Sequence, residues 1–213
     1  MFDQLGSAVV LPDWLSPFAA ELFPGYGEFV AHEVSAERLL IFSSTIIPGI
    51  LQTQLYAKRS IEVHISRLSS ETGRERLLKL RLKRQWSIFE RSNPPTINVI
   101  LEEAALRRNL AGHAIMKEQL LHIRELVDAG RITLQIIRFD APNVPVEDTS
   151  SFVICQNGMS FLTSFEMTTG QQNLYDPTVC RMYCGLFDKF SEIADDQTTS
   201  MRFLDDLIAN YYV

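Results

Sequence analysis

The sequence has few cysteines and no long hydrophobic run, and these two absences exclude several classes of protein. Only three of the 213 residues are cysteine, namely Cys155, Cys180 and Cys184. An odd number of cysteines in a chain without a secretory signal does not predict a disulfide framework. No hydrophobic run reaches the roughly 20 residues that a membrane-spanning helix needs. We therefore expect a cytoplasmic protein with free thiols and no membrane partner.

The sequence also lacks the common signatures of metal, cofactor and catalytic sites. Cys180 and Cys184 have helical i, i+4 spacing on an apolar pattern, which favours buried packing residues, with a redox or metal role as the alternative. The four histidines are scattered, and no spacing resembles a zinc site. There is no glycine-rich phosphate loop and no Gly-x-Ser-x-Gly motif. We expect no metal and no cofactor, and it stays open whether the chain is an enzyme.

Acidic residues outnumber basic residues overall, but positive charge is concentrated in one segment. The net charge is −6, which argues against capture of nucleic acid by the whole surface. Residues 67–91, in contrast, carry eight lysines and arginines against three glutamates. A solvated helix face is the simpler interpretation of this stripe, and binding of an acidic partner or of phosphates is the alternative.

The first half of the chain has mainly helical patterns. Apolar residues at helical spacing predict a helix over residues 28–42, and Pro48 suits the first turn of a second helix that continues to Arg59, with Ile50, Leu51 and Leu55 in the core. A third helix is predicted over residues 70–91, where Asn93-Pro94-Pro95 ends it. We treat residues 1–13 as a lead and residues 14–95 as mainly helical.

The second half changes to β-type patterns. Strands are predicted over residues 96–101, 132–139, 151–156 and 159–167, with helices over residues 103–110 and 113–129 and Gly130 at a C-cap. Asn157-Gly158 predicts a hairpin with a type I′ turn, and residues 141–150 form a loop. Pro177 begins a helical segment, and residues 198–211 form the last helix. We expect one α+β domain over residues 1–213, with a small mixed or antiparallel sheet and helices packed on it.

Several short motifs occur in a fixed order along the chain. After Glu33 and Ala36 come Ile47-Pro48-Gly49-Ile50-Leu51-Gln52-Thr53-Gln54-Leu55-Tyr56-Ala57, then Arg81-Leu82-Lys83-Arg84-Gln85, then Glu103-Ala104-Ala105-Leu106-Arg107-Arg108, and then Met116-Lys117-Glu118-Gln119-Leu120. Together they resemble the domain of unknown function that follows a helix-turn-helix in many actinobacterial Xre-type regulators, which are described as antitoxin-like. The resemblance extends from about Trp14 to the C-terminus.

The resemblance implies a domain that receives a signal or a small partner protein while a helix-turn-helix reads DNA. Only Met1 to Asp13 precede the resemblance here, which is too short for a helix-turn-helix. We therefore expect this chain to have no DNA-binding domain of its own. It could then compete for the partner or form a homodimer.

Arg84, Gln85 and Trp86 are candidate ligand-binding residues. A guanidinium beside an aromatic ring is suited to a bidentate hold on a carboxylate, although internal bracing of another helix is the simpler alternative. Gln119 and Arg107 join this set because they lie in the motifs that carry the resemblance.

Glu103, His113 and Glu166 are the candidate acid–base residues. Glu103 and Arg107 have the i, i+4 spacing of a helical ion pair, which is their structural alternative. His113 follows Gly112 near a helix start, where a capping or surface residue is the usual occurrence. Glu166 comes at the end of a strand, where a buried carboxylate must be paired. We expect a cavity between the strands 96–101 and 159–166 and the helices that carry Arg84 and Arg107.

Two functions are compatible with these patterns. The first is a regulatory module that binds a small-molecule ligand or a small partner protein. The second is an enzyme recruited from the same fold in natural-product biosynthesis, with acid–base or cyclase- and isomerase-type chemistry on a small molecule. The absence of a recognised catalytic motif favours the first function, and fold kinship alone does not decide between them.

This chain should not bind duplex DNA in a sequence-specific manner, because base readout needs an element placed in a groove and no segment supplies one. A mobility-shift assay with its own promoter region at physiological salt measures this. Sub-micromolar, sequence-specific binding would contradict the prediction.

Overall fold

A computed structural model describes residues 10–64, 70–145 and 150–212 of the chain. A six-stranded mixed sheet forms its centre, with the strand order β3-β2-β1-β4-β5-β6. Strands β1 (Arg38–Ser43), β2 (Thr96–Glu102) and β3 (Thr133–Ile137) run parallel to one another. Strands β4 (Phe152–Asn157), β5 (Ser160–Met167) and β6 (Gly170–Leu174) continue the sheet as an antiparallel meander. The expected α+β class is confirmed.

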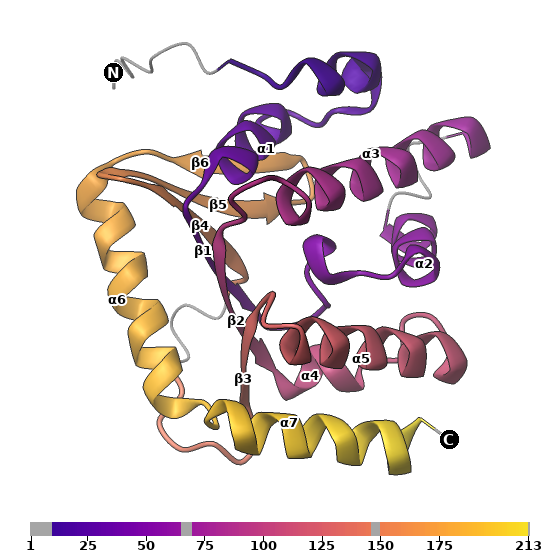
Figure 1. Ribbon diagram of the computed structural model, residues 1–213, viewed down its shortest axis with the longest axis vertical. Coiled ribbons are helices and arrows are strands. Elements are labelled where there is room, and N and C mark those ends of the chain that lie inside the picture. Colours follow the sequence, from indigo (N-terminus) through magenta and orange to yellow (C-terminus); the bar gives the residue numbers. More distant parts are fainter. Residues whose placement is uncertain (1–9, 65–69, 146–149, 213) are drawn as a thin grey trace.

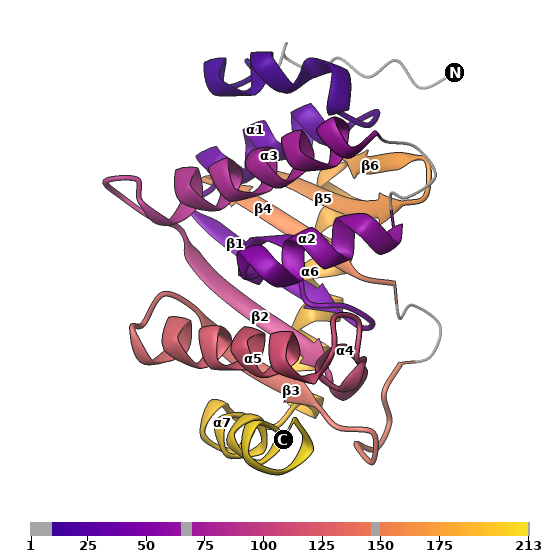
Figure 2. The ribbon, with the colours of Figure 1, turned by 90° about the vertical axis from the view of Figure 1, so that its right-hand side faces the viewer.

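Helices cover both faces of this sheet. The helices on one face are α1 (Tyr26–Ser35), α2 (Gln54–His64), α3 (Glu71–Phe89) and α5 (His113–Asp128), and α6 (Pro177–Ile193) covers the other face (Figures 1 and 2). Short helix α4 (Glu103–Arg107) follows β2, and α7 (Gln197–Asp206) packs beside β3 before a π-turn at Leu207–Tyr211. Two 3₁₀ segments, Asp13–Glu21 and Gly49–Leu51, complete the described elements.

Alternate residues of each central strand enter two separate cores. In β1, Leu39 and Ile41 face the larger core beneath α1, α3 and α5, whereas Leu40 and Phe42 face the smaller core beneath α6. Phe42 stacks there on Phe190, with ring centroids 4.2 Å apart. Because a strand's side chains alternate between the two faces of its sheet, a strand covered on both faces is apolar throughout.

Strand β1 occupies residues that were predicted to be helical. The helix expected over residues 28–42 ends at Ser35, and residues 38–43 form β1 instead. A continuous apolar run does not distinguish a doubly buried strand from a buried helix by periodicity. Strand β6 was missed for the opposite reason, since the sequence Gly-Gln-Gln-Asn-Leu has no apolar alternation.

Two local expectations also need correction. Pro48 precedes a 3₁₀ turn at Gly49–Leu51, and α2 begins only at Gln54, so Leu55 lies in its first turn and is 47% exposed. In the β4–β5 hairpin, Asn157 pairs with Ser160, which leaves Gly158 and Met159 as the loop. Of these two, only Gly158 has a positive φ, so the turn is not type I′.

Other boundaries agree with the sequence analysis. The Ser70 side chain caps α3 by accepting a hydrogen bond from the Gly73 N–H (3.1 Å), and the helix ends just before the predicted boundary. Gly130 takes a positive φ after α5, as a helix end requires. The remaining parts of these expectations, residues 1–9 of the lead, 67–69 of the basic segment and 146–149 of the loop, lie outside the described residues.

No helix among the described residues is long and apolar enough to cross a membrane. All three cysteines are free, with Cys155 and Cys180 buried and Cys184 half-buried. Cys180 therefore packs in the interior, as its spacing predicted.

Leu51 and Leu55 give a matched test of the fold. Leu51 is fully buried in the larger core, so Leu51→Ala should lower the free energy of unfolding by about 2–5 kcal/mol, as large-to-small core substitutions do. Leu55→Ala removes the same atoms from an exposed site and should change it by less than about 1 kcal/mol. Urea denaturation of both variants checks this, and equal losses would show that the 3₁₀ turn is misplaced.

Candidate functional site

A cavity of about 440 Å³ lies on the face of the sheet that carries α1 and α3. Its wall is formed by the carboxyl end of β1, the start of β4, the end of β5, the segment from Thr45 to Gln52 and one face of α3. This volume lies in the range of small-molecule sites, about 300–1,000 Å³. Much of the lining is apolar: Phe23, Phe29, Ile41, Ile46, Pro48, Ile50, Ile61, Leu77, Leu80, Val153 and Met167.

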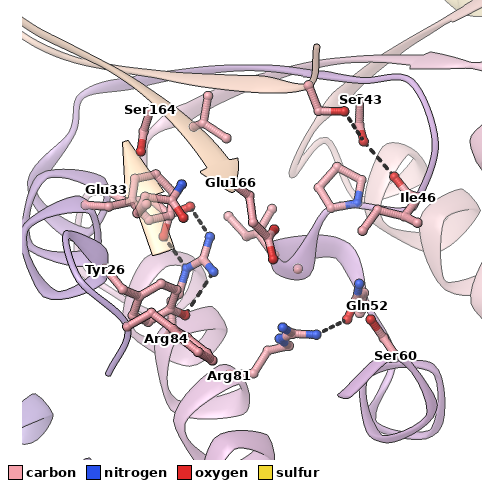
Figure 3. Close-up of a pocket in the computed structure, with 18 of the residues that line it drawn as sticks. Tyr26, Glu33, Ser43, Ile46, Gln52, Ser60, Arg81, Arg84, Ser164 and Glu166 are labelled. Atoms are coloured by element: carbon pink, nitrogen blue, oxygen red, sulfur yellow. Dashed lines mark hydrogen bonds and ion pairs between the residues drawn. The ribbon is translucent and has the colours of Figure 1, made fainter. Parts of the chain in front are cut away.

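A buried ion pair borders one side of the cavity. The Arg84 guanidinium on α3 makes a bidentate interaction with the Glu33 carboxylate on α1, including a hydrogen bond of 2.6 Å from Nη2 to Oε1. Arg84 Nη1 also donates to the Tyr26 hydroxyl at 3.2 Å (Figure 3). Burial alone would lower the pKa of Arg84, but the Glu33 charge raises it above its ordinary value. The two charges therefore neutralise each other and join α1 to α3.

Arg81 reaches the cavity from the same face of α3. It lies three residues before Arg84, and residues at i and i+3 share a helix face. Its Nη1 donates to Gln52 Oε1 at 2.7 Å. Burial lowers the pKa of Arg81 and the nearby Glu166 charge opposes this shift. Among the described residues, no carboxylate lies within ion-pair distance of Arg81, so the guanidinium keeps hydrogen-bonding capacity for a ligand.

Glu166 enters the cavity from the end of β5. Its side chain points into the space between the Glu33–Arg84 pair and Gln52 (Figure 3). The residue is exposed, and in the described part of the chain its side chain makes no hydrogen bond and no ion pair. A carboxylate in this position can accept hydrogen bonds from a ligand.

The rim at Pro48–Thr53 is held by two glutamine side chains. Gln85 Nε2 donates to the carbonyl oxygens of Gly49 (2.7 Å) and Gln52 (2.8 Å). Gln119 on α5 accepts from the Thr53 N–H and donates to the Leu51 carbonyl oxygen, both at 2.7 Å. These bonds satisfy backbone groups that no regular element pairs. Gln85 and Gln119, expected as ligand contacts, therefore brace the rim and do not line the cavity.

Gly170 fits the opposite rim tightly against the chain before α1. Gly170 has a φ of +143°, and a Cβ on it would lie 2.6 Å from the Pro24 carbonyl oxygen. The same oxygen accepts a hydrogen bond of 2.8 Å from the Gln171 N–H. A larger residue than glycine at position 170 would push this rim apart.

Glu103 and Arg107 lie in a separate polar cluster at the end of β2. The Glu103 carboxylate accepts from Arg107 (2.5 Å), Arg138 (2.9 Å) and the Phe139 N–H (3.0 Å). Burial would raise the pKa of Glu103, but these donors lower it below its ordinary value. Neither residue lines the cavity. The expectation that Glu103 and Arg107 share the cavity with Arg84 and Glu166 is wrong. Arg138 and the Phe139 N–H, which follow β3, bind the Glu103 carboxylate at the end of β2 instead.

The other two candidates also lie away from the cavity. His113 is exposed and contacts the rings of Tyr211 and Tyr212. Trp86 is 58% exposed on the outer face of α3, where the Lys83 ammonium lies 4.0 Å from its ring centroid. The basic stripe of α3 is thus divided, since Arg81 and Arg84 face inwards and Lys83 faces outwards.

Several cavity residues were missed as site candidates, above all Glu33, Arg81 and Gln52. Each belongs to a motif that carried the resemblance, and the i, i+3 spacing of Arg81 and Arg84 was the available signal. No group of three or more potential metal-ligating side chains occurs among the described residues. The charged, polar and apolar side chains that line the cavity can bind a ligand by hydrogen bonds, charge and apolar contact.

Residues 26–206 match the profile of a protein family described as a domain of unknown function (DUF5753). The match begins with α1 and ends with α7, so it includes every cavity residue named above except Phe23. No curated protein and no solved structure matches the chain.

The buried ion pair generates a stability prediction. Glu33→Gln removes the only carboxylate paired with Arg84 in the described structure and leaves a buried cation, which should lower the free energy of unfolding by about 3–5 kcal/mol. Glu62→Gln disrupts the exposed pair with Arg59 and should cost less than about 1 kcal/mol. Urea denaturation at neutral pH compares the two, and similar losses would mean that Glu33 and Arg84 are solvated.

Proposed function

The chain belongs to the family of the domain of unknown function DUF5753, and from this membership and the cavity we propose that it is a regulatory module that binds a small molecule. The observation that carries the proposal is the pair Arg81 and Glu166, whose charges face a mostly apolar cavity without an ion-pair partner among the described residues. Pockets with apolar walls and a few convergent polar groups are typical ligand sites.

The regulatory part of the proposal rests on the motifs. They resemble the effector domain of actinobacterial, antitoxin-like Xre-type regulators, in which a helix-turn-helix reads DNA. The Pro48–Thr53 rim is the motif segment that the cavity, α3 and α5 share. A ligand that contacts Gln52 or Arg81 therefore contacts the element that links two helices, which is a suitable place to convert binding into a signal for a partner protein.

The enzymatic alternative has less support. It relies on side chains that exchange protons with a substrate, and of the three candidate acid–base residues only Glu166 lines the cavity. Glu103 is fixed by two arginines, and the exposed His113 contacts the rings of Tyr211 and Tyr212. A reaction that uses Glu166 alone would be the remaining form of this alternative.

A metabolite screen by thermal shift tests the proposed function. At least one small molecule should raise the melting temperature of the wild type, because ligands that bind only the folded state stabilise it. Glu166→Gln should keep the unliganded melting temperature within a few degrees but reduce the ligand-induced shift. Glu118→Gln, an exposed carboxylate on α5 outside the cavity, should leave both unchanged. If Glu166→Gln destabilises the unliganded protein as Glu33→Gln does, Glu166 has a structural role instead.

A further inference from the structure

The charged groups of the cavity can be divided into satisfied pairs and unsatisfied charges. Glu33 and Arg84 neutralise each other, and Glu21 at the edge is paired with Arg76. Arg81 and Glu166 remain, one positive and one negative, and they are not within ion-pair distance of each other. The cavity therefore presents two separated opposite charges and no net charge.

We propose that the ligand of this cavity is a zwitterion, namely a free α-amino acid with a large apolar side chain. The proposal deepens the proposed function and rests on it. The α-carboxylate binds the Arg81 guanidinium, the α-ammonium binds the Glu166 carboxylate, and the side chain packs on the apolar wall. A head group that carries both charges lies between α3 and the end of β5, where Figure 3 shows the two side chains directed into the same space.

The hydrogen-bonding state of Arg81 supports its role as the carboxylate site. Its Nη1 is engaged by Gln52, whose own Nε2 donates to the Ile47 carbonyl oxygen at 2.7 Å, so the guanidinium is held in place. None of the other guanidinium hydrogens has a hydrogen-bond acceptor among the described residues. A planar guanidinium fixed at one nitrogen is well placed to bind a carboxylate through its remaining donors.

The charge balance selects a zwitterion over simpler ions. A plain carboxylate would pair with Arg81 but would bring a second negative charge close to Glu166. A plain amine would pair with Glu166 but would approach Arg81. Each mismatched charge in a partly desolvated site is unfavourable, and only a ligand with both charges has both satisfied.

The wall of the cavity defines the rest of the ligand. Phe29, Ile41, Ile50 and Leu80 provide apolar contact, and 440 Å³ accommodates a head group and a large side chain together. A small polar amino acid would leave this wall in contact with water. We therefore expect phenylalanine, tryptophan, leucine and methionine to bind more tightly than glycine or serine.

Calorimetric titration of the wild type with three related probes decides the charge requirement. The probes are L-phenylalanine, 3-phenylpropionate, which lacks the ammonium, and phenethylamine, which lacks the carboxylate. L-Phenylalanine should bind at least about tenfold more tightly than either analogue, since each lost charge-assisted hydrogen bond weakens binding by about that factor or more. Tryptophan, leucine and methionine are each compared in the same way with the analogue that lacks the ammonium and with the analogue that lacks the carboxylate.

Two variants assign each charge to its residue. Glu166→Gln should lower the affinity for L-phenylalanine but should bind 3-phenylpropionate as tightly as the wild type does, or more tightly. Arg81→Gln should lower the affinity for L-phenylalanine and should bind phenethylamine as tightly as the wild type does, or more tightly. Two control variants remove one positive and one negative charge outside the cavity, namely Lys79→Gln on the exposed side of α3 and Glu118→Gln on α5. They should leave the affinities for all three probes unchanged. If Arg81→Gln does not fold, the three probes on the wild type and on Glu166→Gln still decide the question.

The outcomes separate this inference from the proposed function. Binding of 3-phenylpropionate as tightly as the amino acid overturns the zwitterion, and so does a screen that finds ligands while all the amino acids fail to bind. In both cases a ligand-binding module remains. If neither the amino acids nor any molecule of the screen binds, both proposals fail.

Discussion

The interaction on which the site depends is the buried ion pair between Glu33 and Arg84. It fixes α1 against α3 on the face of the sheet that carries the larger core. Both residues are almost fully buried, with exposures of 0% for Glu33 and 7% for Arg84. Because a bidentate guanidinium–carboxylate pair allows one relative orientation, the rotation of α3 about its axis is set. Arg81, one turn earlier, is then directed into the cavity, and Gln85 is directed onto the Gly49–Gln52 rim. The charges of Glu33 and Arg84 also cancel, so this pair contributes no net charge to ligand selection.

The sheet topology supplies the space that the ion pair borders. Strand β1 is parallel to β2 and antiparallel to β4, so the carboxyl end of β1 lies beside the amino end of β4. The chain that leaves β1 crosses over this end as the Pro48–Thr53 rim before it enters α2, and sites in open sheets commonly form where the strand order changes direction. The rim has little regular hydrogen bonding of its own, which explains why Gln85, Gln119 and Arg81 all donate to it or accept from it. These contacts hold three of the motifs that carry the resemblance against one another, namely the rim, the Arg81–Gln85 segment of α3 and the segment of α5 around Gln119.

Local patterns predicted most elements of the fold, whereas the composition of the site depended on tertiary contacts. Helices α3 and α5 and strands β2 to β5 were evident from periodicity, capping and turn residues, because each has its own signal. Strand β1 was not, since burial on both faces removes the alternation that identifies a strand. For the site, Arg84 and Glu166 were recognised as polar residues at special positions, but their separation from Glu103 and Arg107 was not. That separation is decided by Arg138 and Phe139, whose approach to Glu103 depends on the β2–β3 pairing and leaves no local pattern.

Arg81 is difficult to explain by stability alone. A guanidinium in a partly dry cavity loses hydration, and its lowered pKa reflects that loss. A single neutral hydrogen bond to Gln52 compensates only a small part of it. A methionine of similar length would have no charge to desolvate in a cavity that Leu77, Leu80 and Ile61 also line, and replacement of buried charges by apolar side chains is often neutral or stabilising. Glu166 across the cavity offsets part of this cost without forming a pair. A charge that the folded chain leaves incompletely satisfied acquires its full partner when a ligand carrying the opposite charge binds, which is the physical basis for treating this cavity as a site.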